Sequence, residues 1–209
     1  MMDNVCGRCG LYRADKLIDP SGPDAICPEC GQRHRFIQAR LLMVAGASGS
    51  GKTTVCRQLT GAVPQAVLLD ADILWRPEFD DPGSHYRDFF ETWLRMCKNI
   101  AQSGRPAVMF GAGFGVPDNI EPCVERRYFS TTHYLALTCA DAVLVDRLER
   151  RPSWRGAGGA GFVEGQLQFN AWFQRYDATP RIDVLDTSNV PLQTTADQVA
   201  SWIARQLAP

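Results

Sequence analysis

The stretch LLMVAGASGSGKTTVCRQL, residues 41–59, decides the fold of this chain. It opens with a short apolar run typical of a buried strand, and KTTVCRQLTG has the composition of a helix that ends at Gly61. Between them, residues 46–53 fill every fixed position of the phosphate-binding pattern G-x-x-x-x-G-K-[ST]. A strand, a glycine-rich turn and a helix in this order are the context that the pattern requires, so we predict a nucleotide-binding loop.

The predicted loop holds the triphosphate of a nucleotide mainly through its backbone. Its N–H groups meet the β-phosphate at the helix N-terminus, where the helix dipole favours anions. We expect Lys52 to bridge the β- and γ-phosphates and the Thr53 hydroxyl to ligate Mg²⁺. The nucleotide-binding residues predicted here are Gly46, Ala47, Ser48, Gly49, Ser50, Gly51, Lys52, Thr53 and Thr54. A chance glycine-rich turn is the alternative, which the complete motif disfavours.

Beyond this loop the chain alternates short apolar runs with helical patterns. The runs cover residues 65–72, 105–113, 133–141 and 181–188. They show little polar alternation, as expected for parallel strands covered on both faces. Between them, residues 84–104 place a broad apolar stripe on one helix face, namely Tyr86, Phe89, Phe90, Trp93, Cys97 and Ile100. We therefore predict a three-layer α/β fold with about five parallel strands and crossover helices.

Four of the eight cysteines form two C-x2-C pairs separated by 17 residues. They are Cys6, Cys9, Cys27 and Cys30. Zinc prefers four thiolates in a tetrahedron, and a glycine follows each pair where the backbone turns around the ion, so we predict a zinc ribbon. Two disulfides are the alternative, disfavoured by the lack of a secretion signal and by the four remaining thiols. Four cysteine ligands leave no open coordination position, which indicates a structural metal.

We place the ribbon at residues 1–39 and a nucleotide-binding domain at residues 40–209. So short a ribbon cannot build its own core, and a structural zinc supplies about 10 kcal/mol of folding free energy. The segment RHRFIQAR, with Arg33, His34, Arg35 and Arg40, is a candidate strip for nucleic-acid phosphates. A solvated strand edge explains it equally well, and nucleic-acid contact is the less favoured interpretation.

Composition limits the possible functions. The chain is 45% hydrophobic, enough for one core of ordinary domain size with a small appendage. No run approaches the roughly 18 apolar residues of a membrane helix, and a formal net charge of −1 provides no overall field toward nucleic acid or an anionic membrane. We expect a cytoplasmic protein without a membrane partner.

Two acidic residues stand at the end of the second predicted strand, in LLDADILWRPEF. Ligands of parallel sheets bind beyond the carboxyl ends of the strands, so Asp70 and Asp72 are candidates for catalysis. One carboxylate there can orient or deprotonate an acceptor hydroxyl, and the other can hold a Mg²⁺-bound water. The alternative is that Asp72 only caps a helix starting at Ile73. We favour catalysis, with Asp72 ahead of Asp70 as the base.

The third strand ends in glycines, AVMFGAGFG. Phosphate-hydrolysing motors and switches usually carry an acidic residue at this place to bind the magnesium water, so the glycines argue against a motor ATPase. Gly111, Gly113 and Gly115 either leave room for an acceptor substrate or form a simple wide turn.

Arginines gather after the fourth strand. Arg147, Arg150 and Arg151 fall on the last turns of a predicted helix, and Arg155 precedes a glycine-rich segment that runs to Gly161. An arginine-bearing lid would stabilise a transferred phosphoryl group and exclude water. The alternative is that these are C-terminal charges favoured by the helix dipole.

Residues 41–207 resemble the P-loop small-molecule, nucleoside and nucleotide kinases. The resemblance rests on GASGSGKTT, on the DAD at the second strand end, on DRLERRPSWR and on LDTSNVPLQTTADQVASWI. It implies ATP and Mg²⁺ as cofactors. It also implies that the lid arginines Arg147, Arg151 and Arg155 lie near the phosphates, and that Thr187, Ser188 and Asn189 lie near the base. The ribbon departs from the usual single-domain kinase.

Two functional hypotheses follow. The favoured one is an ATP- and Mg²⁺-dependent kinase that phosphorylates a hydroxyl of a small molecule, with nucleosides and antibiotic-like compounds as candidates. The other is a nucleotide-regulated protein that recognises nucleic acid or a partner through the ribbon. Candidate acceptor-site side chains are Trp75, Arg76, His85, Tyr86 and Arg87, of which the aromatic ones are equally compatible with a core role. The sequence predicts neither the acceptor nor the oligomeric state.

Overall fold

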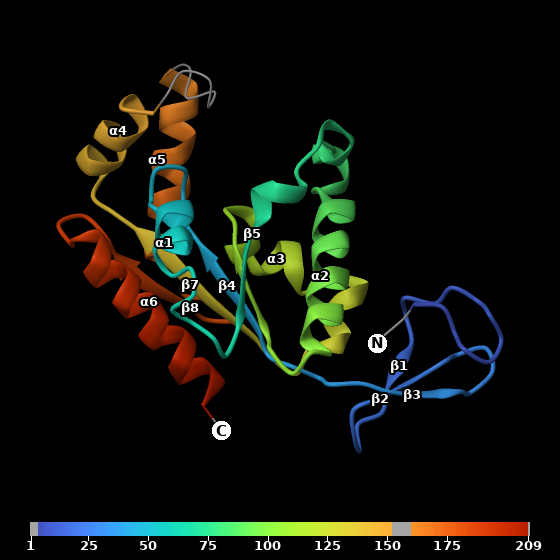
Figure 1. Cartoon of the computed structure of the whole chain (residues 1–209). Helices are drawn as coiled ribbons and strands as arrows, with labels where there is room; N and C mark the ends of the chain where they lie inside the picture. Colours follow the sequence, from blue (N-terminus) through green and yellow to red (C-terminus); the bar gives the residue numbers. More distant parts are fainter. Residues whose placement is uncertain (1–3, 152–159, 209) are drawn as a thin grey trace.

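The computed structural model describes residues 4–151 and 160–208, which form two sheets (Figure 1). A small antiparallel sheet has the order β1-β2-β3, with β1 at Leu17–Ile18, β2 at Asp24–Ile26 and β3 at Arg33–Arg35. A larger parallel sheet has the order β5-β6-β4-β7-β8. Its strands are β4 at Leu41–Ala45, β5 at Val67–Asp70, β6 at Ala107–Phe110, β7 at Thr132–Thr138 and β8 at Ile182–Asp186. Four of the five predicted apolar runs contain one of these strands, and the run at 133–141 overlaps β7, which begins one residue earlier.

Helices cover both faces of the parallel sheet (Figure 1). The α-helices are α1 at Lys52–Gln58, α2 at Arg87–Ala101, α3 at Pro117–Ile120, α4 at Asp141–Glu149, α5 at Ala160–Arg175 and α6 at Leu192–Leu207. Short 3-10 helices are η1 at Ala71–Leu74, η2 at Pro77–Phe79, η3 at Pro82–Ser84, η4 at Gly113–Gly115 and η5 at Val124–Tyr128. The predicted three-layer α/β fold is confirmed.

The central strand β4 explains how the layers are held together. All five of its residues are buried, and they alternate between the two faces of the sheet. Leu41, Met43 and Ala45 pack in the cluster that contains side chains of α2 and α5. Leu42 and Val44 pack in the cluster that contains side chains of α1 and α6. A strand covered on both faces must be apolar throughout, which is why LLMVA carries no polar residue.

Helix α2 confirms most of the predicted stripe and departs from it at two places. Phe89, Phe90, Trp93 and Cys97 are buried, but Tyr86 precedes the helix with a φ of 56° and is 36% exposed. Tyr86 lies outside the stripe because the chain turns just before the helix begins. On the same helix Lys98 is buried, although its charge predicts exposure.

The basic strip around β3 is not a row of free cations. Arg33 forms ion pairs with Asp19 and Asp24, both within the small sheet region. Arg40 donates to the backbone carbonyls of Gln206 and Ala208 at 2.5 and 2.6 Å. Of the arginines in this strip, Arg35 is the most exposed, with Asp24 at 3.9 Å. The geometry favours the interpretation as a solvated strand edge.

No helix in the described parts of the chain is long and apolar enough to cross a membrane.

Candidate active site

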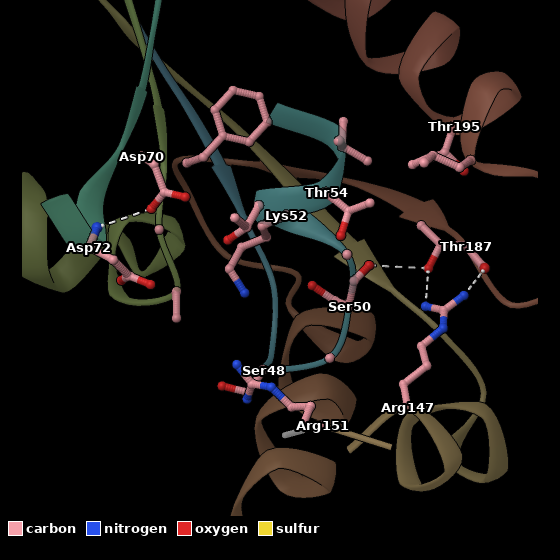
Figure 2. Close-up of a pocket in the computed structure, with 18 of the residues that line it drawn as sticks. Ser48, Ser50, Lys52, Thr54, Asp70, Asp72, Arg147, Arg151, Thr187 and Thr195 are labelled. Atoms are coloured by element: carbon pink, nitrogen blue, oxygen red, sulfur yellow. Dashed lines mark hydrogen bonds between the residues drawn. The ribbon is translucent and has the colours of Figure 1, made fainter. Parts of the chain in front are cut away.

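A cavity of about 490 Å³ opens at the carboxyl ends of the parallel strands (Figure 2). Its floor is the loop and first turn of α1, residues 48–55. Asp70 and Asp72 lie on one side of Lys52, and Arg147 and Thr187 lie on the other (Figure 2). This cavity therefore brings together the loop, the acid pair and an arginine that are far apart in the sequence.

Gly46 shapes the start of the loop. Its φ is 142°, and a Cβ added there would lie 2.2 Å from the Leu137 carbonyl oxygen and 2.5 Å from Ser50 Oγ. Only glycine fits this position, because an added Cβ would overlap the backbone of β7. The chain can then bend sharply from β4 into the loop, and the helix α1 begins at Lys52.

Lys52 contacts its own loop. Its Nζ donates to the carbonyl oxygens of Gly46 and Ala47 at 2.8 and 2.9 Å. Burial lowers the pKa of Lys52 to about 8, while the nearby carboxylates of Asp72 and Asp70 oppose this shift. The ammonium group must leave these carbonyls to bind a phosphate.

The loop also contacts helix α5. The backbone N–H of Ser48 donates to Gln166 Oε1 at 2.7 Å. Since an N–H group can only donate, the carbonyl oxygen of the glutamine side chain must face the loop. Sequence reasoning did not identify Gln166, and no local pattern distinguishes it from the other polar residues of α5.

Asp70 and Asp72 differ in how they are held. Asp70 ends β5 and caps η1, since its Oδ1 accepts a hydrogen bond from the Asp72 backbone N–H at 3.1 Å. The alternative that Asp72 is the helix cap is therefore wrong: the strand ends two residues earlier, so the cap position falls on Asp70. The direction of Asp72 is set by η1 and not by strand alternation. Both side chains nevertheless line the cavity.

The backbone between the two acids is held from α2. The indole N–H of Trp93, which is fully buried, donates to the Ala71 carbonyl oxygen at 3.2 Å. Ala71 itself is buried in the same apolar cluster as Trp93. This contact fixes the peptide on which both carboxylates depend.

The predicted lid arginines separate into different environments. Arg147 donates to the Thr187 hydroxyl oxygen at 3.0 Å and to the Thr187 carbonyl oxygen at 2.7 Å, and it lines the cavity. Arg151 also lines the cavity, whereas Arg150 pairs with Asp146 on the surface at 2.8 Å. Arg155 lies outside the described residues.

The loop after β8 only partly matches the predicted base-binding set. Thr187 is buried and lines the cavity, where its hydroxyl donates to the Thr138 carbonyl oxygen at 3.0 Å. Ser188 instead donates to Asp186 and accepts the Ala140 backbone N–H at 2.7 Å, which orders the start of α4. Among the described residues that line the cavity, Ser188 and Asn189 do not occur.

The three glycines after β6 mostly make room for the protein itself. A Cβ on Gly115 would lie 2.1 Å from the Ala45 Cβ, and one on Gly113 would lie 3.0 Å from the Phe90 ring. Gly111 lines the cavity, but its Cβ position is 2.7 Å from the Ala71 Cβ. Close packing of η4 on the sheet thus accounts for Gly113 and Gly115.

The four ribbon cysteines lie together. Their sulfur atoms all lie within 4.8 Å of one another, with 3.5 Å between Cys6 and Cys30 and 3.9 Å between Cys9 and Cys27. Four sulfurs around a tetrahedral zinc are separated by about 3.8 Å, so these residues fit the ion. The thiols influence one another: a hydrogen bond from the Cys9 backbone lowers the pKa of Cys6 to about 5. At Cys30 a backbone hydrogen bond from Gln32 acts in the same direction, but burial and the neighbouring cysteine sulfurs outweigh it and raise the pKa of Cys30 to about 11.

Comparison with known proteins adds a family and a fold. Residues 41–176, well over half of the chain, match the family described as AAA domain. No curated protein sequence matches significantly.

Several solved structures share the fold. An unliganded sugar kinase from Janibacter sp. HTCC2649 is 18% identical with a TM-score of 0.56, covering 79% of this chain and 95% of its own. A shikimate kinase from Acinetobacter baumannii in complex with shikimate is 16% identical with a TM-score of 0.52, covering 82% and 96%. A gluconokinase from Sinorhizobium meliloti 1021 is 19% identical with a TM-score of 0.50, covering 83% and 100%. These likenesses show that the chain shares its α/β fold with these three proteins.

Proposed function

The chain belongs to the AAA domain family, and we propose that it is an ATP- and Mg²⁺-dependent phosphotransferase that moves the γ-phosphate to a hydroxyl of a small molecule. The observation that carries this proposal is the shared cavity: the phosphate loop, two carboxylates and two arginines face one space of about 490 Å³. The fold of the chain resembles the folds of a sugar kinase, a gluconokinase and a shikimate kinase, and this resemblance supports the same reaction class.

The loop and Lys52 bind the phosphates in this proposal. Backbone N–H groups of residues 48–53 surround the β-phosphate, and Lys52 exchanges its two carbonyl partners for phosphate oxygens. Thr53 would ligate Mg²⁺, which neutralises charge on the β- and γ-phosphates when bound.

We assign the base to Asp72 and a supporting role to Asp70. Asp70 is held as a helix cap by its contact with the Asp72 N–H. The Asp72 carboxylate has no hydrogen-bond or ion-pair partner among the described residues, so it is available to accept a proton from an acceptor hydroxyl. Asp70 would then hold a Mg²⁺-bound water.

The arginines and the loop after β8 complete the proposed nucleotide site. Arg147 and Arg151 line the cavity and would stabilise charge on the transferred phosphoryl group, together with Arg155. Arg147 also donates to the hydroxyl and carbonyl oxygens of Thr187, so Thr187 lies beside these arginines. We propose that the adenine lies beside residues 187–189.

The acceptor would enter beside the acids. Trp75 and Tyr86 lie with ring centroids 6.1 Å apart and are 46% and 36% exposed, close in sequence to Asp72 and to α2. Aromatic faces of this kind suit the apolar face of a sugar or a base, which supports nucleosides and antibiotic-like compounds as acceptors.

The domain division is part of the proposal. Residues 1–39 form a structural zinc ribbon, and residues 40–209 form the phosphotransferase domain. The four cysteine sulfurs support zinc because their separations fit a tetrahedral thiolate site.

A panel of nucleosides, sugars and aminoglycosides tests the function through acceptor-dependent ADP release. We expect slow ATP turnover alone and a large increase with the correct acceptor. Asp72→Asn should abolish transfer and leave ATP affinity within about twofold, because the amide keeps the shape but cannot accept the proton. Asp70→Asn is the matched variant. It should raise the Mg²⁺ concentration needed for half-maximal activity by a larger factor than it lowers the maximal rate.

Two results would contradict the proposal. One is ATP hydrolysis that no acceptor stimulates. The other is salt-sensitive nucleic-acid binding that an Arg35→Gln substitution weakens, which would favour the nucleotide-regulated binding protein instead.

A further inference from the structure

We infer that the zinc ribbon is a positioning element for the acid pair and that it acts through helix α2. The small sheet lies at the C-terminal end of α2 (Figure 1), and Trp93 of the same helix contacts the Ala71 carbonyl oxygen between the two aspartates. The claim that the ribbon affects phosphate transfer rests on the proposed function. The claim that the ribbon holds the segment between Asp70 and Asp72 in place through α2 does not.

A buried charge cluster joins the ribbon to α2. Lys98 is 1% exposed and Glu125 is 0% exposed, and their side chains pair at 2.7 Å. Asn4 from the ribbon accepts a hydrogen bond from Lys98 at 2.5 Å and donates one to Glu125 at 2.7 Å. One ribbon side chain thus contacts both members of an ion pair.

The ribbon supplies two hydrogen bonds of this cluster, both through Asn4, and Arg95 of α2 supplies another to Glu125 at 2.9 Å. A buried ion pair is tolerated only when its remaining donors and acceptors are satisfied. Burial lowers the pKa of Lys98, and the charge of Glu125 opposes this shift. If the ribbon moved away, the pair would lose both hydrogen bonds to Asn4.

Further contacts between the ribbon and α2 lie along the last turns of the helix. Gln102 accepts the Ile37 backbone N–H at 2.8 Å and donates to the Ile37 carbonyl oxygen at 3.1 Å. The Arg95 guanidinium lies 5.8 Å from the centre of the Tyr12 ring. Arg95, Lys98 and Gln102 occupy one face of the helix, because their spacing follows the helical repeat.

The adjoining helix η5 contacts the ribbon as well. Tyr128 donates from its hydroxyl to the Ala14 carbonyl oxygen at 2.5 Å, and its ring packs against Phe36. Arg127 donates to the Asp15 carbonyl oxygen at 3.1 Å. The ribbon is therefore fixed to two helices outside it, α2 and η5.

The same helix α2 holds the acid segment. Trp93 donates to the Ala71 carbonyl oxygen, and Phe89 and Phe90 pack against Phe114. Trp93 and Lys98 are five residues apart, or about 7.5 Å along the helix axis, so a shift of the last turns moves the indole too. Loss of the ribbon contact would loosen the peptide between Asp70 and Asp72.

The test uses Asn4→Leu in the full chain. Leucine has the same branched outline and the same number of non-hydrogen side-chain atoms as asparagine, although it is bulkier. It removes both hydrogen bonds and leaves Lys98 and Glu125 in place. Arg33→Gln is the matched control, because Arg33 pairs within the ribbon with Asp19 and Asp24. Zinc content of both variants is measured by native mass spectrometry and should equal that of the parent.

Hydrogen–deuterium exchange gives the structural result without reference to catalysis. Asn4→Leu should raise exchange in residues 95–102 and in residues 71–75, and it should leave α6 unchanged. Arg33→Gln should leave all three segments unchanged. Unchanged exchange in residues 71–75, or an equal rise in α6, would overturn the inference. Zinc removal by a chelator from the parent chain should reproduce the pattern and decides the matter if Asn4→Leu does not fold.

Kinetics give a second result that simple loss of folded protein would not produce. Asn4→Leu should lower kcat about tenfold and leave the KM for ATP within twofold, because misplacement of the acids affects transfer and not nucleotide binding. An increase in the KM for ATP with unchanged kcat would contradict the inference. If no acceptor is identified, the exchange experiment still decides, so its failure is separate from failure of the proposed function.

Discussion

Gly46→Ala tests the backbone geometry on which the phosphate loop depends. At Gly46 the φ is 142°, and an added Cβ would lie 2.2 Å from the Leu137 carbonyl oxygen. Such a backbone conformation costs a non-glycine residue about 1–3 kcal/mol, and forcing an atom into a packed interior costs about 1–3 kcal/mol more. We expect a loss of about 4 kcal/mol, or roughly 8–16 °C in Tm for a chain of this size.

The matched control is Gly61→Ala. Gly61 also has a positive φ, 76°, but a Cβ there meets no atom within 4 Å. Its cost is the left-handed backbone alone, about 1 kcal/mol, or roughly 2–4 °C. Thermal and urea unfolding followed by circular dichroism measure both variants, and calorimetry measures ATP binding. If the two substitutions cost the same, or if Gly46→Ala binds ATP normally, the steric argument for this loop is wrong.

Three further predictions concern single contacts. The pKa of Lys52 is lowered to about 8, and bound phosphates favour the ammonium form, so ATP binding above pH 8 should take up a proton. The ATP affinity should therefore fall about tenfold per pH unit above about pH 8, until the pKa of Lys52 in the complex is reached. Calorimetry in buffers of different ionisation enthalpy measures the proton uptake, and finding none would contradict this prediction. Gln166→Ala frees the Ser48 N–H for a phosphate, so ATP should bind more tightly by about 1 kcal/mol, and an unchanged Kd refutes the competition. Glu125→Gln leaves Lys98 buried without its counter-charge and should cost about 3 kcal/mol in urea unfolding; a loss below 1 kcal/mol would show that the pair is dispensable.

Local patterns in the sequence were sufficient to predict the parallel sheet. The strands β4 and β6 are short and buried on both faces, so their apolar runs identify them without knowledge of their neighbours. The edge strand β8 is less regular, because it contains Asp183 and Asp186 and exposes Val184. The loop was predictable for a different reason: residues 46–53 must adopt one backbone conformation, and that conformation dictates glycines at fixed positions.

Contacts between distant segments could not be predicted in this way. Asn4 and Glu125 are 121 residues apart, and Lys98 is a charged residue on an amphipathic helix, a pattern that predicts exposure. Burial of Lys98 depends on a ribbon that packs against α2 only in the folded chain. Gln166 could not be predicted either. Its partner is the backbone N–H of Ser48, and a backbone group leaves no pattern in the sequence.

The acid pair shows how small errors in element boundaries change an assignment. The strand was expected to reach Asp72 but ends at Asp70, so the cap role belongs to the first aspartate. The cavity nevertheless contains both residues, because they follow a strand whose carboxyl end faces the loop. Position at a strand end is therefore a more reliable signal than side-chain alternation.

A crystal structure with a non-hydrolysable ATP analogue and Mg²⁺ tests the central claim most directly. We predict that the terminal phosphate lies within hydrogen-bond distance of Lys52 Nζ, with the Asp72 carboxylate facing it across a space wide enough for an acceptor hydroxyl. A terminal phosphate bound far from both Asp70 and Asp72 would contradict the proposed transfer reaction.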